Sequence, residues 1–185
     1  MFENLLKRIA GELRSRAIPY MVIGGQAVLL YGEPRLTKDI DITLGVGTER
    51  VADVMAVTQR LGLKELVDGA EAFVRDTMVL PVADEESGIR VDFIFSFSPY
   101  EREAIGRGKM VRFGDTDVCF ASLEDLIVHK IIASRPRDIE DVRAILLKNP
   151  DYDRTYIEEW LREFDNVLGG EFLRVFVTLT SRLEG

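Results

Sequence analysis

Three aspartates occupy apolar, strand-like surroundings where a charged side chain is costly. Asp39 and Asp41 flank Ile40 in the run D-I-D-I-T-L, and Asp92 lies in the run I-R-V-D-F-I-F. Because side chains alternate along a strand, Asp39 and Asp41 project from the same face. Aspartate is disfavoured in strands, and close carboxylates lose hydration and repel one another, so a counter-charge is needed. The pattern predicts a cation site.

The predicted ligands are oxygen atoms only, which favours a hard divalent cation. Three carboxylates from two neighbouring strands can hold two Mg²⁺ ions, with Mn²⁺ as an alternative. Two such ions can bridge nucleotide phosphates and lower the charge barrier to in-line attack at phosphorus. The aspartate nearest the acceptor is then the candidate general base. His129 is the sole histidine, so we interpret it as structural.

A glycine pair precedes the acidic run and suits the same chemistry. Gly24 and Gly25 follow the apolar strand predicted over Tyr20–Ile23 and precede a short buried helix predicted over 26–31, which Gly32 ends. A strand that turns tightly into a helix presents free backbone N–H groups and the positive end of the helix dipole, which bind phosphate oxygens. By itself the pair also fits a tight turn without a ligand.

The remaining pattern predicts an α/β (α+β) protein with a mixed sheet. The spacing of apolar residues predicts helices over 3–16, 48–61 with Thr48 as N-cap, and 99–107. Strands are predicted over 37–44, 72–75, 78–82, 89–95, 110–113 and 118–120, and helices over 123–134, 136–147, 153–164 and up to about 183. We therefore expect an α/β core over 1–121 and a C-terminal helical bundle over 122–185, packed as a single compact unit.

Composition restricts the partners. The net charge of −8, from 24 basic and 32 acidic residues, disfavours a broad surface for duplex nucleic acid. A small-molecule or protein acceptor is weakly favoured, although a local basic groove leaves tRNA open. No stretch approaches the ~20 apolar residues of a membrane span, and the N-terminus lacks the long apolar core of a signal peptide. We expect a cytoplasmic protein, and Cys119 within V-C-F-A is interpreted as an inert core thiol.

The run G-G-x-A, then R-x-T-x-D-I-D-I, then a distant V-D-F resembles the nucleotidyltransferase superfamily with the polymerase-beta-type fold. Within it, the chain is most similar to the small bacterial branch that includes AbiEii-type toxin nucleotidyltransferases. The resemblance extends to Asp125–Val142, where K-I-I-A-S-R-P-R-D-I-E-D is similar to the K…R-x-x-D-x-x-D segment of that branch.

The resemblance implies roles for individual residues. Gly24 and Gly25 are expected at the triphosphate, Lys130 at nucleotide phosphates, and Asp39, Asp41 and Asp92 as metal ligands and catalytic groups. Arg137, Asp138 and Asp141 match the last segment as helix-borne support for the site. One position departs from the pattern: many active members carry Ser or Thr directly after the glycines, and here the residue is Gln26. A glutamine amide can donate a similar hydrogen bond, but its longer reach would move the phosphate or leave it without that contact.

Several of these residues have a second interpretation. Arg35 could neutralise phosphate or form an ion pair with Asp39, and Thr37 precedes the same acidic pair. Lys130 lies on a helix with an apolar face and could be a solvated lysine. Arg137 and Asp141 are four residues apart on a helix and could form only a surface ion pair.

The function predicted from the sequence is transfer of a nucleoside monophosphate from an NTP to an acceptor hydroxyl or similar nucleophile, with release of pyrophosphate. One alternative is a catalytically inactive nucleotide-binding or partner-binding module of the same fold. Another is a toxin of a toxin–antitoxin pair that modifies the acceptor end of tRNA. The acceptor stays open, as do an antitoxin partner and a homo-oligomer.

Overall fold

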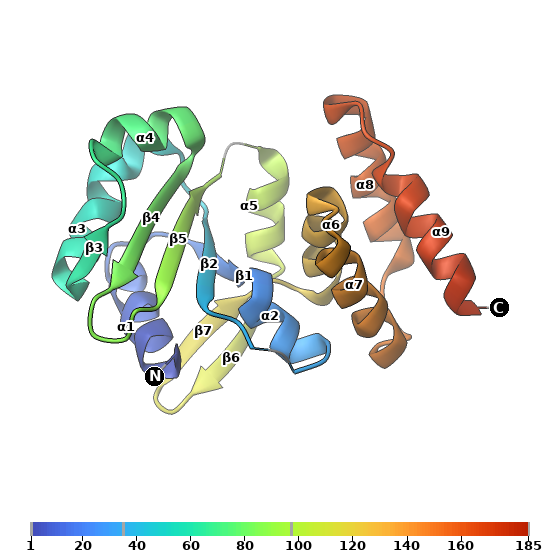
Figure 1. Ribbon diagram of the computed structural model, residues 1–185, viewed down its shortest axis with the longest axis horizontal. Helices are drawn as coiled ribbons and strands as arrows, with labels where there is room; N and C mark the ends of the chain where they lie inside the picture. The colour runs from blue at the N-terminus through green and yellow to red at the C-terminus, as the bar shows by residue number, and fades with distance from the viewer. Residues whose placement is uncertain (1, 35, 97, 185) are drawn as a thin grey trace. The chain divides into compact units, whose positions relative to one another are not determined.

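The computed structural model describes residues 2–34, 36–96 and 98–184 (Figure 1). The chain divides into two compact units. We call the unit of residues 1–26 and 36–121 the sheet unit, and the unit of residues 27–35 and 122–185 the helical unit. The short helix α2 (Gly24–Tyr31) begins in the first and ends in the second.

The described part of the sheet unit contains one mixed sheet of seven strands. The mixed character of the sheet confirms the prediction from the sequence. Parallel pairing joins β2 to β5 and β1 to β7, and the other neighbouring strands are antiparallel. Across the sheet the order is β3 (Leu63–Glu65), β4 (Val79–Asp84), β5 (Arg90–Phe95), β2 (Asp39–Leu44), β1 (Tyr20–Ile23), β7 (Thr116–Phe120) and β6 (Lys109–Phe113).

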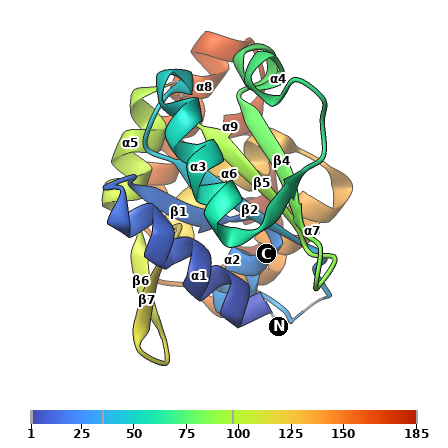
Figure 2. The same ribbon diagram turned by 90° about the vertical axis from the view of Figure 1, so that its left-hand side faces the viewer.

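Helices and a short 3-10 turn surround this sheet. They are α1 (Phe2–Ser15), the 3-10 turn η1 (Thr48–Arg50), α3 (Val51–Leu61), α4 (Ala70–Thr77) and α5 (Pro99–Gly106). Figure 2 shows α1 and α3 side by side over one face of the sheet. Apolar positions recur along α1 at helical spacing and are buried, so this helix stabilises the sheet mainly by removing apolar surface from water.

The central strand β2 has the alternation that the sequence predicts. Ile40, Ile42 and Leu44 are fully buried on one face. On the other face Asp39 is exposed and Asp41 is half-buried. The apolar face therefore anchors the strand, which leaves the aspartates on the opposite face.

In the helical unit, α6 (Leu123–Ala133), α7 (Pro136–Lys148), α8 (Arg154–Leu168) and α9 (Phe172–Glu184) follow one another, as predicted. Ser122 caps α6, because its Oγ accepts a hydrogen bond from the backbone N–H of Asp125 at 3.1 Å. Asp153 caps α8 in the same way through the N–H of Tyr156. The core is apolar and includes Leu126, Ile131, Val142, Ile145, Ile157, Leu161 and Phe176.

Three local predictions were wrong. The segment predicted as a strand over 72–75 lies in α4, where Ala70 and Val74, four residues apart, are buried. Thr48 begins η1 instead of capping a helix, and the preceding Gly47 makes no side-chain cap. Cys119 is half-buried, not fully buried, although burial does raise the pKa of its thiol.

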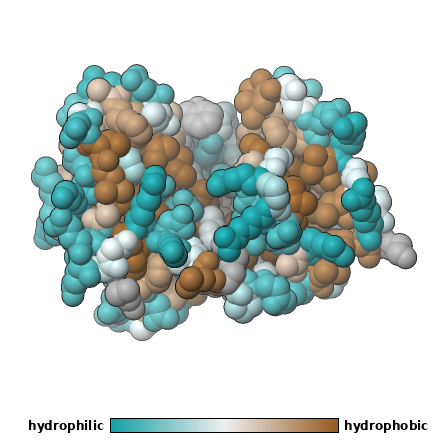
Figure 3. Space-filling view, in the orientation of Figure 1, coloured by the Kyte–Doolittle hydropathy of each residue, from teal (hydrophilic) through white to brown (hydrophobic). Residues whose placement is uncertain are grey.

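The surface of the helical unit carries several exposed hydrophobic residues. Figure 3 shows brown, hydrophobic side chains among teal ones over the C-terminal helices. The exposed residues include Leu147, Val167, Leu168 and Val177. Within the residues that the structure describes, every helix is too short or too polar to cross a bilayer.

Thr43 of β2 is fully buried, and its hydroxyl has no hydrogen-bond partner in the described part of the chain. We expect Thr43→Val to raise the free energy of unfolding by about 1 kcal/mol, because a buried polar group without a partner retains its desolvation cost. Thr58→Val is the matched control, since Thr58 is equally buried but donates to the carbonyl of Met55 at 2.8 Å. Urea unfolding measures both, and a loss of stability in Thr43→Val would contradict the expectation.

Candidate active site

The two strands that carry the aspartates are parallel neighbours. In their register Asp41 pairs with Asp92, and Asp39 pairs with Arg90. Side chains of paired residues in a sheet lie on the same face, so all three aspartates share one face. This pairing places Asp92 beside Asp41 although about fifty residues separate them in the chain.

Asp39 is held by a neighbouring hydroxyl. Thr37 is buried, and its Oγ1 donates to Asp39 Oδ1 at 3.1 Å and lies 3.3 Å from the Asp39 carbonyl oxygen. The Thr37 side chain therefore orients Asp39, while its predicted contact with a nucleotide stays a prediction.

Arg90 is a functional candidate that sequence reasoning missed. Its Nε donates to Asp92 Oδ1 at 2.9 Å. The hydrogen bond to Asp92 raises the pKa of the guanidinium, and the charges of Asp92, Asp39 and Asp41 raise it further. The strand alternation contained the signal, since Arg90 precedes Asp92 by two positions and must share its face.

Gly24 lies directly against Asp41. It begins α2 with a φ of +63°, and a Cβ built on it would lie 1.9 Å from Asp41 Oδ2. Glycine is therefore required here twice, for its backbone conformation and for the space that the carboxylate fills. Gly25 follows within the first turn of the helix, where N–H groups lack intrahelical partners.

Gln26 is buried, at 7% exposure. Its side-chain amide makes no hydrogen bond to any residue that the structure describes. The amide is therefore not committed to a structural role by such a bond. Arg35, the other predicted phosphate contact of this segment, lies outside the described residues.

Lys130 belongs to the helical unit, where it forms a buried ion cluster with two of the predicted supporting residues. Its Nζ lies 2.8 Å from Asp138 Oδ1 and 2.7 Å from Asp141 Oδ2. The Lys130 side chain is 6% exposed, so it is not a solvated lysine. Arg135 Nε lies 3.1 Å from Asp138 Oδ2, and Arg137 is exposed. The predicted contact between Lys130 and nucleotide phosphates stays a prediction.

The residues on the aspartate face suit a hard divalent cation by their chemistry. The donors are carboxylate oxygens, and the absence of a Cβ at Gly24 leaves the space in which Asp41 Oδ2 lies. Within the described residues, no three Asp, Glu, His or Cys side chains are arranged closely enough to hold an ion. In this structure Asp39 accepts from Thr37 and Asp92 accepts from Arg90 instead.

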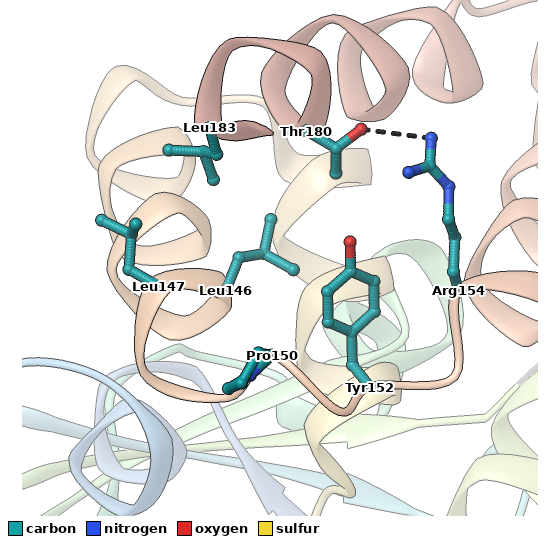
Figure 4. Close-up of a pocket in the computed structure, with 7 residues that line it drawn as sticks. All are labelled: Leu146, Leu147, Pro150, Tyr152, Arg154, Thr180 and Leu183. Atoms are coloured by element: carbon teal, nitrogen blue, oxygen red, sulfur yellow. Dashed lines mark hydrogen bonds between the residues drawn. The ribbon is translucent and has the colours of Figure 1, made fainter. Parts of the chain in front are cut away.

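A cavity of about 390 Å³ lies within the helical unit (Figure 4). Its lining is mostly apolar, and its one cationic side chain, Arg154, donates to Glu158 and, at 3.3 Å, to Thr180 Oγ1. The other lining residues are Leu146, Leu147, Pro150, Tyr152 and Leu183. Because its cation is already bound and its walls are apolar, this cavity is poorly suited to a triphosphate.

Solved structures share the fold. An antigenic nucleotidyltransferase-like protein from Paracoccidioides brasiliensis matches with a TM-score of 0.56 and 14% identity, covering 94% of this chain and 92% of its own. ANT(2″)-Ia, solved in complex with adenylyl-2″-tobramycin, matches with a TM-score of 0.51 and 20% identity, covering 98% of each chain. No curated protein matches the sequence.

A family match covers most of the chain. The model described as "Nucleotidyl transferase AbiEii toxin, Type IV TA system" matches residues 14–174. That range includes the aspartates, the glycine pair and the Lys130 cluster. The chain therefore belongs to the AbiEii family of nucleotidyl transferases.

Proposed function

We propose that this nucleotidyl transferase moves a nucleoside monophosphate from an NTP to an acceptor nucleophile and releases pyrophosphate, using divalent cations held by Asp39, Asp41 and Asp92. The observation that carries the proposal is the pairing of Asp41 with Asp92 across two parallel strands, with Gly24 against Asp41. The Asp41 carboxylate lies against the first residue of α2, and a helix N-terminus is a favourable place for phosphate oxygens, which supports the proposal.

Each residue has a defined part in the proposed reaction. The aspartates hold Mg²⁺, which when bound neutralises phosphate charge and polarises the phosphorus centre. The N–H groups of the first turn of α2, at Gly24 and Gly25, orient the β and γ phosphates. Thr37 keeps Asp39 in position through its hydroxyl. The aspartate nearest the acceptor accepts the proton of the attacking group.

The test is calorimetric titration of each NTP into the protein with and without Mg²⁺. We expect binding that requires Mg²⁺ and that Asp39→Asn/Asp41→Asn eliminates. The matched control is Asp115→Asn/Asp117→Asn, which removes the same charge from a second D-x-D where the side chains bind Lys7 and Arg112. The control variant should bind as the wild type does, and absence of NTP binding by the folded wild type would contradict the proposal.

The family description favours a toxin as the biological role. We expect induced expression of the wild type to slow bacterial growth and the Asp39→Asn/Asp41→Asn variant to have no such effect. Transfer of label from an α-³²P NTP to tRNA, protein or small molecules would identify the acceptor. Binding of an NTP without transfer to any of these would instead favour the inactive module.

A further inference from the structure

Arg90 and the three aspartates form a block of four side chains on one face of two adjacent strands. Asp39 and Asp41 stand two residues apart on β2, and their register partners on β5 are Arg90 and Asp92. One guanidinium therefore lies among three carboxylates. The block carries two more negative charges than positive ones.

The guanidinium of Arg90 is directed at Asp92, the register partner of Asp41. Arg90 Nε donates to Asp92 Oδ1 at 2.9 Å, and the Asp92 side chain is only 20% exposed. Arg90 itself is 54% exposed, so it can leave this position without unpacking the core. Arg90 hydrogen-bonds Asp92 and is the register partner of Asp39, so it stands next to two of the three aspartates.

The Arg90 guanidinium and a divalent cation compete for the Asp92 carboxylate. The lone pair of Asp92 Oδ1 that accepts from Arg90 is unavailable as a ligand, and a positive charge beside a cation site repels the cation. Before a cation binds, the Arg90 guanidinium offsets the mutual repulsion of the carboxylates. Without this positive charge, the carboxylates would turn away from one another. Arg90 therefore keeps the site ordered while no cation is bound, and it weakens the binding of a cation.

We propose that Arg90 is a positioning residue, a tethered counter-ion that orders the three aspartates before a divalent cation binds and then gives up Asp92. The inference rests on the proposed function, because it assumes that the aspartates hold such a cation. Once released, Arg90 stays covalently attached next to the site. Its freed donors then face the anionic nucleotide without any change in the fold.

The test is titration of Mn²⁺ into wild type and Arg90→Gln, together with thermal unfolding without metal. We expect Arg90→Gln to bind Mn²⁺ roughly tenfold more tightly, because a competing charge beside the site is gone. Its metal-free melting temperature should fall by about 2–4 °C, since the carboxylates lose their counter-charge. Arg90→Lys retains the charge and should stay within about threefold of the wild-type affinity.

Arg112→Gln is the matched control. Arg112 also pairs with an aspartate of the sheet unit, with Nη1 at 3.1 Å from both carboxylate oxygens of Asp117. This variant should leave the affinity for Mn²⁺ unchanged. Equal Mn²⁺ affinity of wild type and Arg90→Gln would overturn the inference and leave the proposed function intact. Absence of Mn²⁺ binding by every variant would overturn both.

Discussion

Gly24→Ala is expected to lower nucleotide transfer about a hundredfold, because a displacement of about 1 Å in a catalytic group has costs of that size. The new Cβ would lie 1.9 Å from Asp41 Oδ2 and 2.9 Å from Asp41 Cγ, so the carboxylate must rotate away. A short side chain can rotate at little cost to stability, yet the carboxylate then leaves the space at Gly24 in which it lies. Mg²⁺-dependent binding of NTP, measured by calorimetry, should weaken at least about tenfold for the same reason.

Gly62→Ala separates the steric effect from backbone strain. Gly62 ends α3 at a φ of +70°, close to the +63° of Gly24, but a Cβ built there meets nothing within 4 Å. Both variants should lose about 1 kcal/mol of stability, because alanine is strained at positive φ. Only Gly24→Ala should lose NTP binding, and equal losses of binding in the two variants would argue against our account of Asp41.

Lys130→Met is expected to lower the free energy of unfolding by about 3–5 kcal/mol, since removing one partner of a buried ion pair leaves uncompensated charge. Asp138 and Asp141 would lose their shared cation, and their side chains are only 12% and 9% exposed. Two buried carboxylates would then repel each other at the junction of α6 and α7. Urea unfolding followed by far-UV circular dichroism measures the change.

Two further variants test this explanation. Lys148→Met removes a lysine of the same unit whose partner Glu33 is 67% exposed, and should cost no more than about 1 kcal/mol. Lys130→Met/Asp138→Asn/Asp141→Asn leaves no buried unpaired charge, because the Arg135 side chain that loses Asp138 is exposed, and it should regain at least about 2 kcal/mol of the loss. If Lys130→Met is as stable as the wild type, the cluster does not stabilise the helical unit.

Local pattern predicted most of the elements, and its errors have identifiable causes. Strand β1 (Tyr20–Ile23) has the predicted bounds, because a short apolar run between Pro19 and a glycine pair allows few alternatives. The segment of α4 was misread because Phe73 and Val74 favour strands, while burial of Ala70 and Val74 on one helical face decides the structure. Strand β3 has only three residues and no pattern that distinguishes it from a loop.

The shared face of Asp39 and Asp41 and the glycine pair near them could be predicted from the sequence alone. Alternation within one strand is a local property, so Asp39 and Asp41 had to share a face. The glycine pair marked the change from strand to helix, and in the structure the helix begins at Gly24. Those features point to phosphate and cation binding before any fold is known. The family resemblance carried by the same residues agrees with the family match over residues 14–174.

Only the tertiary structure decided which groups meet. The register of β2 against β5 brings Asp92 to Asp41 and Arg90 to Asp39, and it depends on packing between strands that are remote in the chain. The fit of Asp41 Oδ2 into the space at Gly24 and the enclosure of Lys130 by two aspartates likewise arise from contacts between elements. A strand or helix determines which way its own side chains point, but the cooperative packing of the core selects their partners.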